Sequence, residues 1–329
     1  MSMMKLRHAF VAAVALLALS PASRAADHVK FSYVVPTVQY GSLMVGIDKG
    51  YFAQEGIEVE LVQAGGGVAT PALIAGDLNF SGSPSVAVSA DLKGAHLKAI
   101  FVGSDHSAFQ LWVQPDIKTF DDLKGKPIGI ISRGDTTEIA LRYILAKRNL
   151  PDDYFSYTPL GTGTARVAAL ASGSFPAAMI DAGDARDLKE AGKIGKLHLL
   201  MDMAKEVHMT FGGFATSDAM IASKPDVVRR TVRGLMKGLV VVRSDRATTI
   251  AALVNHGSTP TAAAEDYDLN TPTLSPTSVV SDEDQAFEMK LRARMLGVDD
   301  TKIPPSSNFF DFSFVKQAAA ELKAENWKP

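Results

Sequence analysis

The chain of 329 residues contains no cysteine. This absence excludes disulfide bonds, cysteine-ligated zinc, iron–sulfur clusters and a cysteine nucleophile, and it leaves no cysteine to carry an N-terminal lipid. An excess of positive charge is also missing, because 34 Lys and Arg residues stand against 36 Asp and Glu residues. Nucleic acid is therefore not expected as a partner, since phosphate binding needs a clear basic excess. After residue 25 no apolar run is long enough for a membrane-spanning helix.

The N-terminal segment has the three parts of a secretory signal peptide. A basic start that includes Arg7 precedes an apolar run at residues 9–19, and residues 20–25 supply small residues and a proline. The apolar run is shorter than the run of about 20 residues that spans a bilayer. We therefore expect residues 1–25 to be a signal peptide cleaved after Ala25, and the mature protein to be periplasmic. The alternative is an uncleaved N-terminal anchor.

From residue 27 onward, short runs of β-branched and aromatic residues alternate with stretches of helical spacing. This alternation predicts an α/β protein with largely parallel strands. The composition, 47% apolar and 21% charged, is that of a folded protein, and the length favours about two domains. The expected strands include 29–35, 57–62 and 97–102, and the expected helices include 136–148 and 225–243.

No Gly/Ser-rich or Pro-rich linker divides the chain. Two lobes would then be joined by strands, and we expect the chain to cross between them near Val113 and near Thr216. The Phe-rich segment 309–314 is expected to pack under the first lobe, with a contact to a partner as the alternative. The expected division is residues 26–113 for the first part of lobe I, 114–215 for lobe II, and 216–329 for the second part of lobe I with the C-terminal helices.

Four short motifs follow one another in the order found in a known family. They are 46–60 (GIDKGYFAQEGIEVE), 73–80 (LIAGDLNF), 122–129 (DLKGKPIG) and 168–173 (AALASG). Together with the signal peptide, they resemble the substrate-binding proteins of the nitrate/sulfonate/taurine class of ABC importers. This group also includes thiamine-precursor-binding proteins, and the resemblance covers about residues 28–245.

This resemblance implies a two-lobed periplasmic binding protein fold of type II, with two hinge crossings and a ligand between the lobes. It also implies that the transmembrane subunits of an ABC permease, with their ATPase, are the partners. The loop at 36–41 lacks the Trp and His that are usual in the pyrimidine-binding type. Residues 179–183 stand where the sulfonate type often has Trp-Glu-Pro-Tyr. The named ligand therefore stays open.

Ligands of open α/β sheets bind beyond the carboxyl ends of the strands, where the N-termini of helices favour anions. In the first such turn, Tyr40 can stack on a flat ligand and Gln39 can bind a polar edge, with a plain helix start as the alternative. In the second turn, Ser83 can cap a helix or bind a carboxylate or sulfonate, and Gly82 lets a ligand approach the backbone closely. The resemblance implies a ligand contact at this second turn.

Two further turns belong to the second lobe. Arg133 can pair with an anion or be solvated, and Thr136 begins a helix. Thr162 is a donor near a helix start, and Asp181 can accept from an amine or hydroxyl or can cap a helix. The expected ligand-binding residues from all turns are Gln39, Tyr40, Gly66, Ser81, Ser83, Arg133, Thr136, Thr137, Thr162 and Asp181.

Common enzyme motifs are missing from the sequence. It contains no G-x-G-x-x-G dinucleotide fingerprint, no P-loop and no H-E-x-x-H, and the turn at Ser83 lacks the second glycine of a nucleophile elbow. The histidines are scattered along the chain. We therefore expect no catalytic residue, no metal and no cofactor.

The sequence thus predicts a monomeric solute-binding component of an ABC importer. We expect it to capture a small organic anion, a sulfonate or carboxylate, because most of the candidate contacts are donors at helix starts. The lobes would close on this anion and deliver it to the permease. Two alternatives stay open: an enzyme on the same fold that acts in cofactor-precursor metabolism, and a periplasmic sensor subunit.

Overall fold

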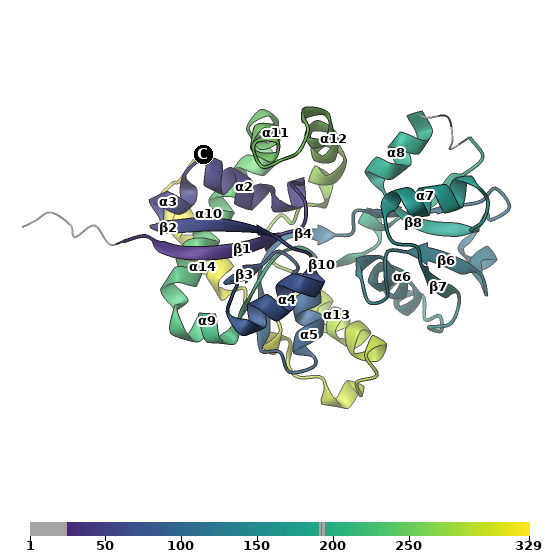
Figure 1. The fold of residues 1–329 in the computed structure, drawn as a ribbon. Helices are drawn as coiled ribbons and strands as arrows, with labels where there is room; N and C mark the ends of the chain where they lie inside the picture. The colour runs from purple at the N-terminus through teal and green to yellow at the C-terminus, as the bar shows by residue number, and fades with distance from the viewer. Residues whose placement is uncertain (1–24, 191, 193–194) are drawn as a thin grey trace, which may run out of the picture.

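Two five-stranded sheets organise the computed structural model, which describes residues 25–190, 192 and 195–329 (Figure 1). The strand order is β2-β1-β3-β10-β4 in the first sheet and β7-β6-β8-β5-β9 in the second. One strand in each sheet, β10 or β5, runs antiparallel to both of its neighbours. The strands are β1 (Asp27–Tyr33), β2 (Ile57–Gln63), β3 (Phe80–Ser81), β4 (Leu97–His106), β5 (Phe109–Val113), β6 (Pro127–Ile130), β7 (Ser156–Pro159), β8 (Ala177–Asp181), β9 (His198–Asp202) and β10 (His208–Ser217).

Helices alternate with these strands, which confirms the predicted α/β class. The expected helices at 136–148 and 225–243 correspond to α6 and α10. Around the first sheet lie α2 (Gly41–Asp48), α3 (Tyr51–Gln54), α4 (Gly66–Ala75), α5 (Pro84–Asp91), α9 (Asp218–Ser223), α10 (Pro225–Ser244), α11 (Arg246–Asn255), α12 (Pro260–Asn270), α13 (Asp282–Met295) and α14 (Ser313–Ala324), and around the second lie α6 (Thr136–Lys147), α7 (Gly163–Ala171) and α8 (Ala182–Glu190).

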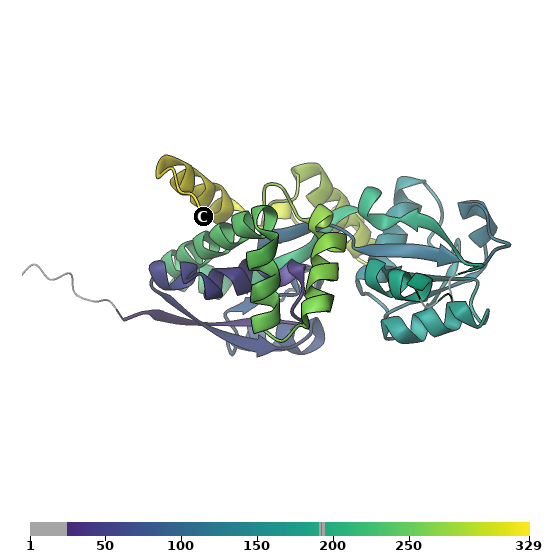
Figure 2. The ribbon, with the colours of Figure 1, turned by 90° about the horizontal axis from the view of Figure 1, so that it is seen from above.

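The chain passes between the two sheets twice, from β4 to β5 and from β9 to β10. Figures 1 and 2 show the two halves side by side with these extended segments between them. The chain therefore crosses earlier than expected, because Val113 is the last residue of β5 and Thr216 lies near the end of β10. β5 belongs to the second sheet instead of the first, and β10 belongs to the first sheet instead of the second. An extended apolar run shows that a strand is present but not which sheet it joins. We therefore propose that the lobes divide before β5 and before β10.

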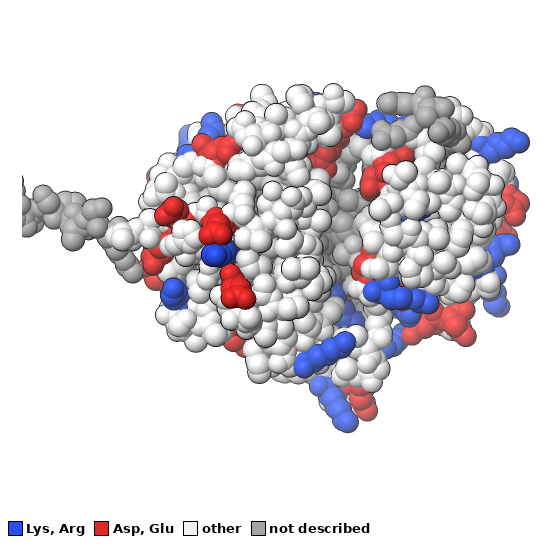
Figure 3. All heavy atoms as spheres, viewed as in Figure 1, with Lys and Arg blue, Asp and Glu red and all other residues white. Residues whose placement is uncertain are grey.

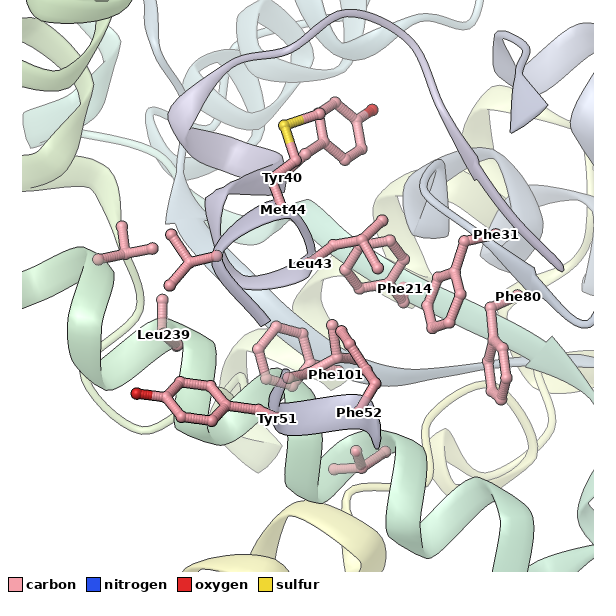
Figure 4. Close-up of a cluster of buried hydrophobic side chains, with 14 of the residues drawn as sticks. Phe31, Tyr40, Leu43, Met44, Tyr51, Phe52, Phe80, Phe101, Phe214 and Leu239 are labelled. Atoms are coloured by element: carbon pink, nitrogen blue, oxygen red, sulfur yellow. The ribbon is translucent and has the colours of Figure 1, made fainter. Parts of the chain in front are cut away.

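An aromatic cluster fills the core between the first sheet and the helices α2, α3 and α10 (Figure 4). Phe31 of β1 stacks on Phe80 of β3 with ring centroids 4.6 Å apart and meets the edge of Phe214 of β10 at 5.1 Å. All three side chains are fully buried, and burial of each such side chain stabilises the fold by about 1.5–3 kcal/mol. The cluster thus fixes the central strands from which the loops toward the second sheet begin.

The C-terminal Phe-rich segment packs on the first lobe. Phe309, Phe310 and Phe312 are buried in a cluster with Val88 and other side chains. The backbone of this segment also pairs with β4, since Ala99 donates its N–H to the carbonyl of Phe309 at 2.9 Å. The prediction that this segment lies under lobe I is therefore confirmed.

The first strand ends two residues earlier than the expected strand at 29–35. β1 ends at Tyr33, and the following Val34 and Val35 are 40% and 47% exposed. These two valines leave the sheet for a loop that faces the second lobe.

The predicted signal peptide, apart from Ala25, lies outside the described residues. Among the helices that the structure does describe, none combines the length and the apolar character needed to cross a bilayer.

Helices α2 and α10 pack closely at Gly238, so a larger residue at this position should destabilise the fold. A Cβ atom at Gly238 of α10 would lie 2.0 Å from the carbonyl oxygen of Ser42 in α2. We expect Gly238→Ala to lower the free energy of unfolding by about 1–3 kcal/mol, because backbone atoms cannot yield as a side chain can. Urea unfolding checks this value. The control is Gly67→Ala in α4, where nothing lies near the added Cβ and a gain of up to about 1 kcal/mol is expected; equal effects at both positions would contradict the account.

Candidate functional site

A cavity of about 750 Å³ lies between the two lobes. The space-filling view in Figure 3 shows the groove that separates the two halves. Residues from both halves of the molecule line the cavity: Val34, Val35, Thr37, Gln39, Tyr40, Gly65, Gly66, Gly82, Ser83, Ser85, Val86, Ala108, Phe109, Ile131, Gly134, Asp135, Thr136, Arg166, Asp181, Gly183, Asp184, Arg186, Phe211, Ala262, Glu265, Asp266, Leu269 and Asn270.

The cavity lies where the strand topology predicts a ligand site. Its walls come from the segments after β1, β3, β6 and β8, which follow the carboxyl ends of these strands. The two strands at the lobe crossings also contribute, because Phe109 of β5 and Phe211 of β10 line the cavity with ring centroids 5.9 Å apart. A molecule bound here would thus touch both lobes and the hinge.

Six of the ten predicted binding residues line this cavity, namely Gln39, Tyr40, Gly66, Ser83, Thr136 and Asp181. Tyr40 has a structural role as well. Its ring is buried and its hydroxyl donates to the carbonyl of Gly82 at 3.0 Å; burial raises its pKa to about 12. Gly82 is needed at this point, because a Cβ atom would lie 2.6 Å from the Tyr40 ring and 2.5 Å from the carbonyl oxygen of Ser32.

Four of the predicted residues do not line the cavity. Ser81 is fully buried, and its hydroxyl accepts from the N–H of Ser83 at 3.3 Å. Thr137 is also buried, and its hydroxyl donates to Asp135 at 2.7 Å. Thr162 caps α7, where it accepts from the N–H of Ala165, and the exposed Arg133 pairs with Glu138 at 3.1 Å. Ser81, Thr137 and Thr162 thus hydrogen-bond to neighbouring protein groups, and none of the four is in the cavity lining.

Sequence reasoning missed most of the charged groups of the cavity. Asp135 and Asp184 line the cavity but are not among the residues predicted from the sequence. Glu265 and Asp266 come from α12, far along the chain from the other walls. Arg166 points from α7 into the protein, where it is 2% exposed and donates to the carbonyl oxygens of Met179 and Gly161. Polar residues with helical spacing do not reveal that two lobes will enclose them.

Five carboxyl groups and two guanidinium groups line the cavity. Burial shifts the pKa values of several of these groups. Burial raises the pKa of Asp135, although Thr137 and the N–H of Glu138 donate to its carboxyl group. Burial also raises the pKa of Asp266, which accepts from the N–H of Val38 at 2.5 Å. The pKa of Arg166 is lowered by its burial, against the opposing charges of neighbouring aspartates. This charge balance opposes the organic anion expected from the sequence.

One ion pair crosses the cavity between the lobes. Arg186 of α8 contacts Glu265 of α12 with 2.6 Å between the nitrogen and the oxygen. In the described part of the chain, no group of three or more acidic or histidine side chains is placed to hold a metal ion.

The sequence model of the family described as NMT1/THI5 like matches residues 37–246. The match includes the four motifs that suggested the importer-associated class, and it confirms that resemblance. It ends before α12, so Glu265 and Asp266 lie outside the matched stretch. A search among curated proteins gave no match.

Solved structures share the fold across nearly the whole chain. A protein of Bordetella bronchiseptica RB50 is 22% identical with a TM-score of 0.71, covering 91% of this chain and 98% of its own. A putative periplasmic sulfonate-binding protein SsuA of Methylobacillus flagellatus KT is 20% identical with a TM-score of 0.72, covering 93% and 98%. The desulfurization enzyme DSZB is 13% identical with a TM-score of 0.61, covering 90% and 99%. These likenesses confirm the two-lobed periplasmic binding protein fold of type II.

Removing the charge of Asp135 is expected to stabilise the empty protein. Because the folded-state pKa of Asp135 is raised, its ionisation costs stability as pH rises through that pKa, whereas below the usual pKa of about 4 this cost is absent. Asparagine caps a helix as well as aspartate does. We expect Asp135→Asn to raise Tm at pH 7 and to have little effect near pH 3, as measured by thermal unfolding across pH.

A second helix cap provides the control with the opposite sign. Asp245 caps α11, and hydrogen bonds from Thr248 lower its pKa. Asp245→Asn should therefore lower Tm at pH 7 and lose its effect as pH falls through that lowered pKa. A lower Tm of Asp135→Asn at pH 7 would contradict our account of the site.

Proposed function

Because the chain belongs to the NMT1/THI5-like family, we propose that it is a solute-binding protein that encloses one small molecule between its two lobes. The observation that carries this proposal is the cavity of about 750 Å³ lined by both lobes and by both hinge strands. Pockets of 300–1,000 Å³ are typical of small-molecule sites.

The function follows from a difference in affinity between two shapes of the protein. In the open form a solute contacts one wall, whereas in the closed form it contacts both. The solute therefore shifts the population toward closure by as much as these extra contacts are worth. Capture at micromolar concentration needs a binding free energy of about −8 kcal/mol. The valines and phenylalanines of the cavity supply apolar surface for this, and its charged groups supply orientation.

The proposed setting is the periplasm, and the proposed partner is an ABC permease with its ATPase. The signal-peptide pattern of residues 1–25 supports export. The permease would recognise the closed form, because only closure brings fixed surfaces of both lobes together. The protein acts as a monomer in this scheme.

An enzyme on the same fold is the second candidate, because DSZB shares the fold at a TM-score of 0.61. The two candidates differ in what happens to the bound molecule. A solute-binding protein releases it unchanged, whereas an enzyme converts it, and mass spectrometry of the released molecule distinguishes these outcomes.

Filling the cavity is expected to abolish solute capture. Ser83 lines the cavity at the start of α5, so Ser83→Trp would occupy the space of the solute. Native mass spectrometry of protein purified from its own host should show a bound small molecule on the unaltered chain and none on the variant. Val240→Trp, at an exposed site on α10, is the control and should keep the molecule. Equal loading of both variants, or no bound molecule on the unaltered chain, would argue against the proposed function.

The ion pair between the lobes is expected to favour the closed form. Pairs of this partly exposed kind contribute about 0.2–1 kcal/mol, which corresponds to at most about a fivefold change in affinity. We expect Arg186→Met and Glu265→Gln to weaken binding of the co-purified solute non-additively, because either change alone breaks the same contact. Calorimetric titration of the two single variants and the double variant measures this coupling.

A pair within one lobe is the matched control for this cycle. Asp268 of the same helix contacts Arg246 at 2.8 Å, and both residues belong to lobe I. Asp268→Asn should leave the affinity unchanged. Fully additive effects of Arg186→Met and Glu265→Gln would show that the contact does not act on closure.

A further inference from the structure

We infer that the solute is an organic cation, an amine or amidine on an apolar body, rather than an anion. This inference rests on the proposed function and assigns the chemical class of its ligand. It starts from the charges of the cavity, where Asp135, Asp181, Asp184, Glu265 and Asp266 stand against Arg166 and Arg186. No lysine or histidine is among the described residues that line the cavity.

Both guanidinium groups already bind groups of the protein. Arg166 is 2% exposed, donates from Nε to the carbonyl of Met179 at 2.5 Å, and interacts electrostatically with Asp135, Asp181 and Asp184. Arg186 contacts Glu265 at 2.6 Å. A sulfonate or carboxylate in this cavity would have to compete with these carboxyl groups for its counter-charge, and it would meet their repulsion.

The carboxyl groups, in contrast, can accept more. The Oδ2 atom of Asp135 is buried and has no hydrogen-bond partner within the described chain. A buried acceptor without a donor is costly, so a ligand N–H group at this position would relieve the cost. Asp266 lines the opposite lobe, and the charge of Asp181 adds to the negative potential around it. A cation between the lobes would face acceptors on both sides.

The rest of the cavity favours an apolar body on this cation. Val34, Val35 and Val86 line the first lobe and are 40%, 47% and 38% exposed. Phe109 and Phe211 line the hinge, and aromatic faces also attract cations. Large apolar side chains gathered at one cavity mark surface that a ligand covers. A small inorganic ion would leave this surface in water.

The acidic residues that α12 contributes to the cavity lie outside the part of the chain that the family model matches. Glu265 and Asp266 follow the matched residues. The family match therefore does not predict the two carboxyl groups on this side of the cavity.

Matched ligand series test the charge of the solute directly. The probes are phenethylamine, tryptamine and hexylamine, each compared by calorimetric titration at pH 7 with the alcohol, the carboxylate and the sulfonate on the same body. We expect at least one amine to bind at least tenfold more tightly than its alcohol, and its carboxylate and sulfonate to bind more weakly than the alcohol. The result that would overturn the inference is tighter binding of a carboxylate or sulfonate than of its amine, or no binding by any amine.

Three variants locate the charge effect. Asp135→Asn and Asp266→Asn should each weaken binding of the best amine about tenfold and change binding of its alcohol less than twofold. Asp268→Asn, on the outer side of the same α12 helix, is the matched control and should change neither. Far-UV circular dichroism checks that all three variants fold, and equal losses for amine and alcohol in both cavity variants would count against the inference.

The failure of this inference and that of the proposed function are distinguishable. Binding of anions with closure of the lobes would overturn the cation and leave solute capture intact. Absence of any co-purified molecule in the native mass spectrum would instead remove the proposed function.

Discussion

The structure depends on one constraint: the two sheets are joined by two strand crossings that lie next to each other. His106 at the end of β4 pairs in register with His208 at the start of β10, and their rings are 4.2 Å apart. Directly beyond them, Phe109 and Phe211 line the cavity. The pivot of any lobe movement and the base of the cavity are therefore formed by the same two crossings, from β4 to β5 and into β10, so we expect a molecule bound there to respond to the angle between the lobes.

The cavity combines two electrostatic influences of opposite sign. Helix N-termini at α5, α6 and α8 bring positive ends of helix dipoles to its walls, which is the feature that suggested an anion. The side chains oppose this, because Asp135 and Asp181 cap two of those helices with carboxyl groups. A formal charge on a side chain outweighs the partial charge of about half a unit at a helix end. The ligand class thus depends on the capping residues more than on the helices.

The sequence alone was enough to predict the cavity residues that lie in turns between a strand and the next helix. Strand-to-helix turns placed Gln39, Ser83 and Thr136 at one cavity, because the carboxyl ends of parallel strands meet at one edge of a sheet. It was insufficient where a role depends on distant parts of the chain. Nothing near Glu265 indicates that α12 will face the loops of the other lobe. A serine after a strand reads the same whether it is buried, as Ser81 is, or lines a cavity, as Ser83 does.

The absence of cysteine permits a direct measurement of lobe closure. Cysteines introduced at Ile74 of α4 and at Ser172 after α7, both exposed and on different lobes, would be the only sites for spin labels. Pulsed electron paramagnetic resonance then reports the distance between the lobes with and without the co-purified solute. The account predicts that the distance distribution shifts and narrows when the solute binds. An identical distribution in both samples would contradict the claim that two lobes close on a molecule between them.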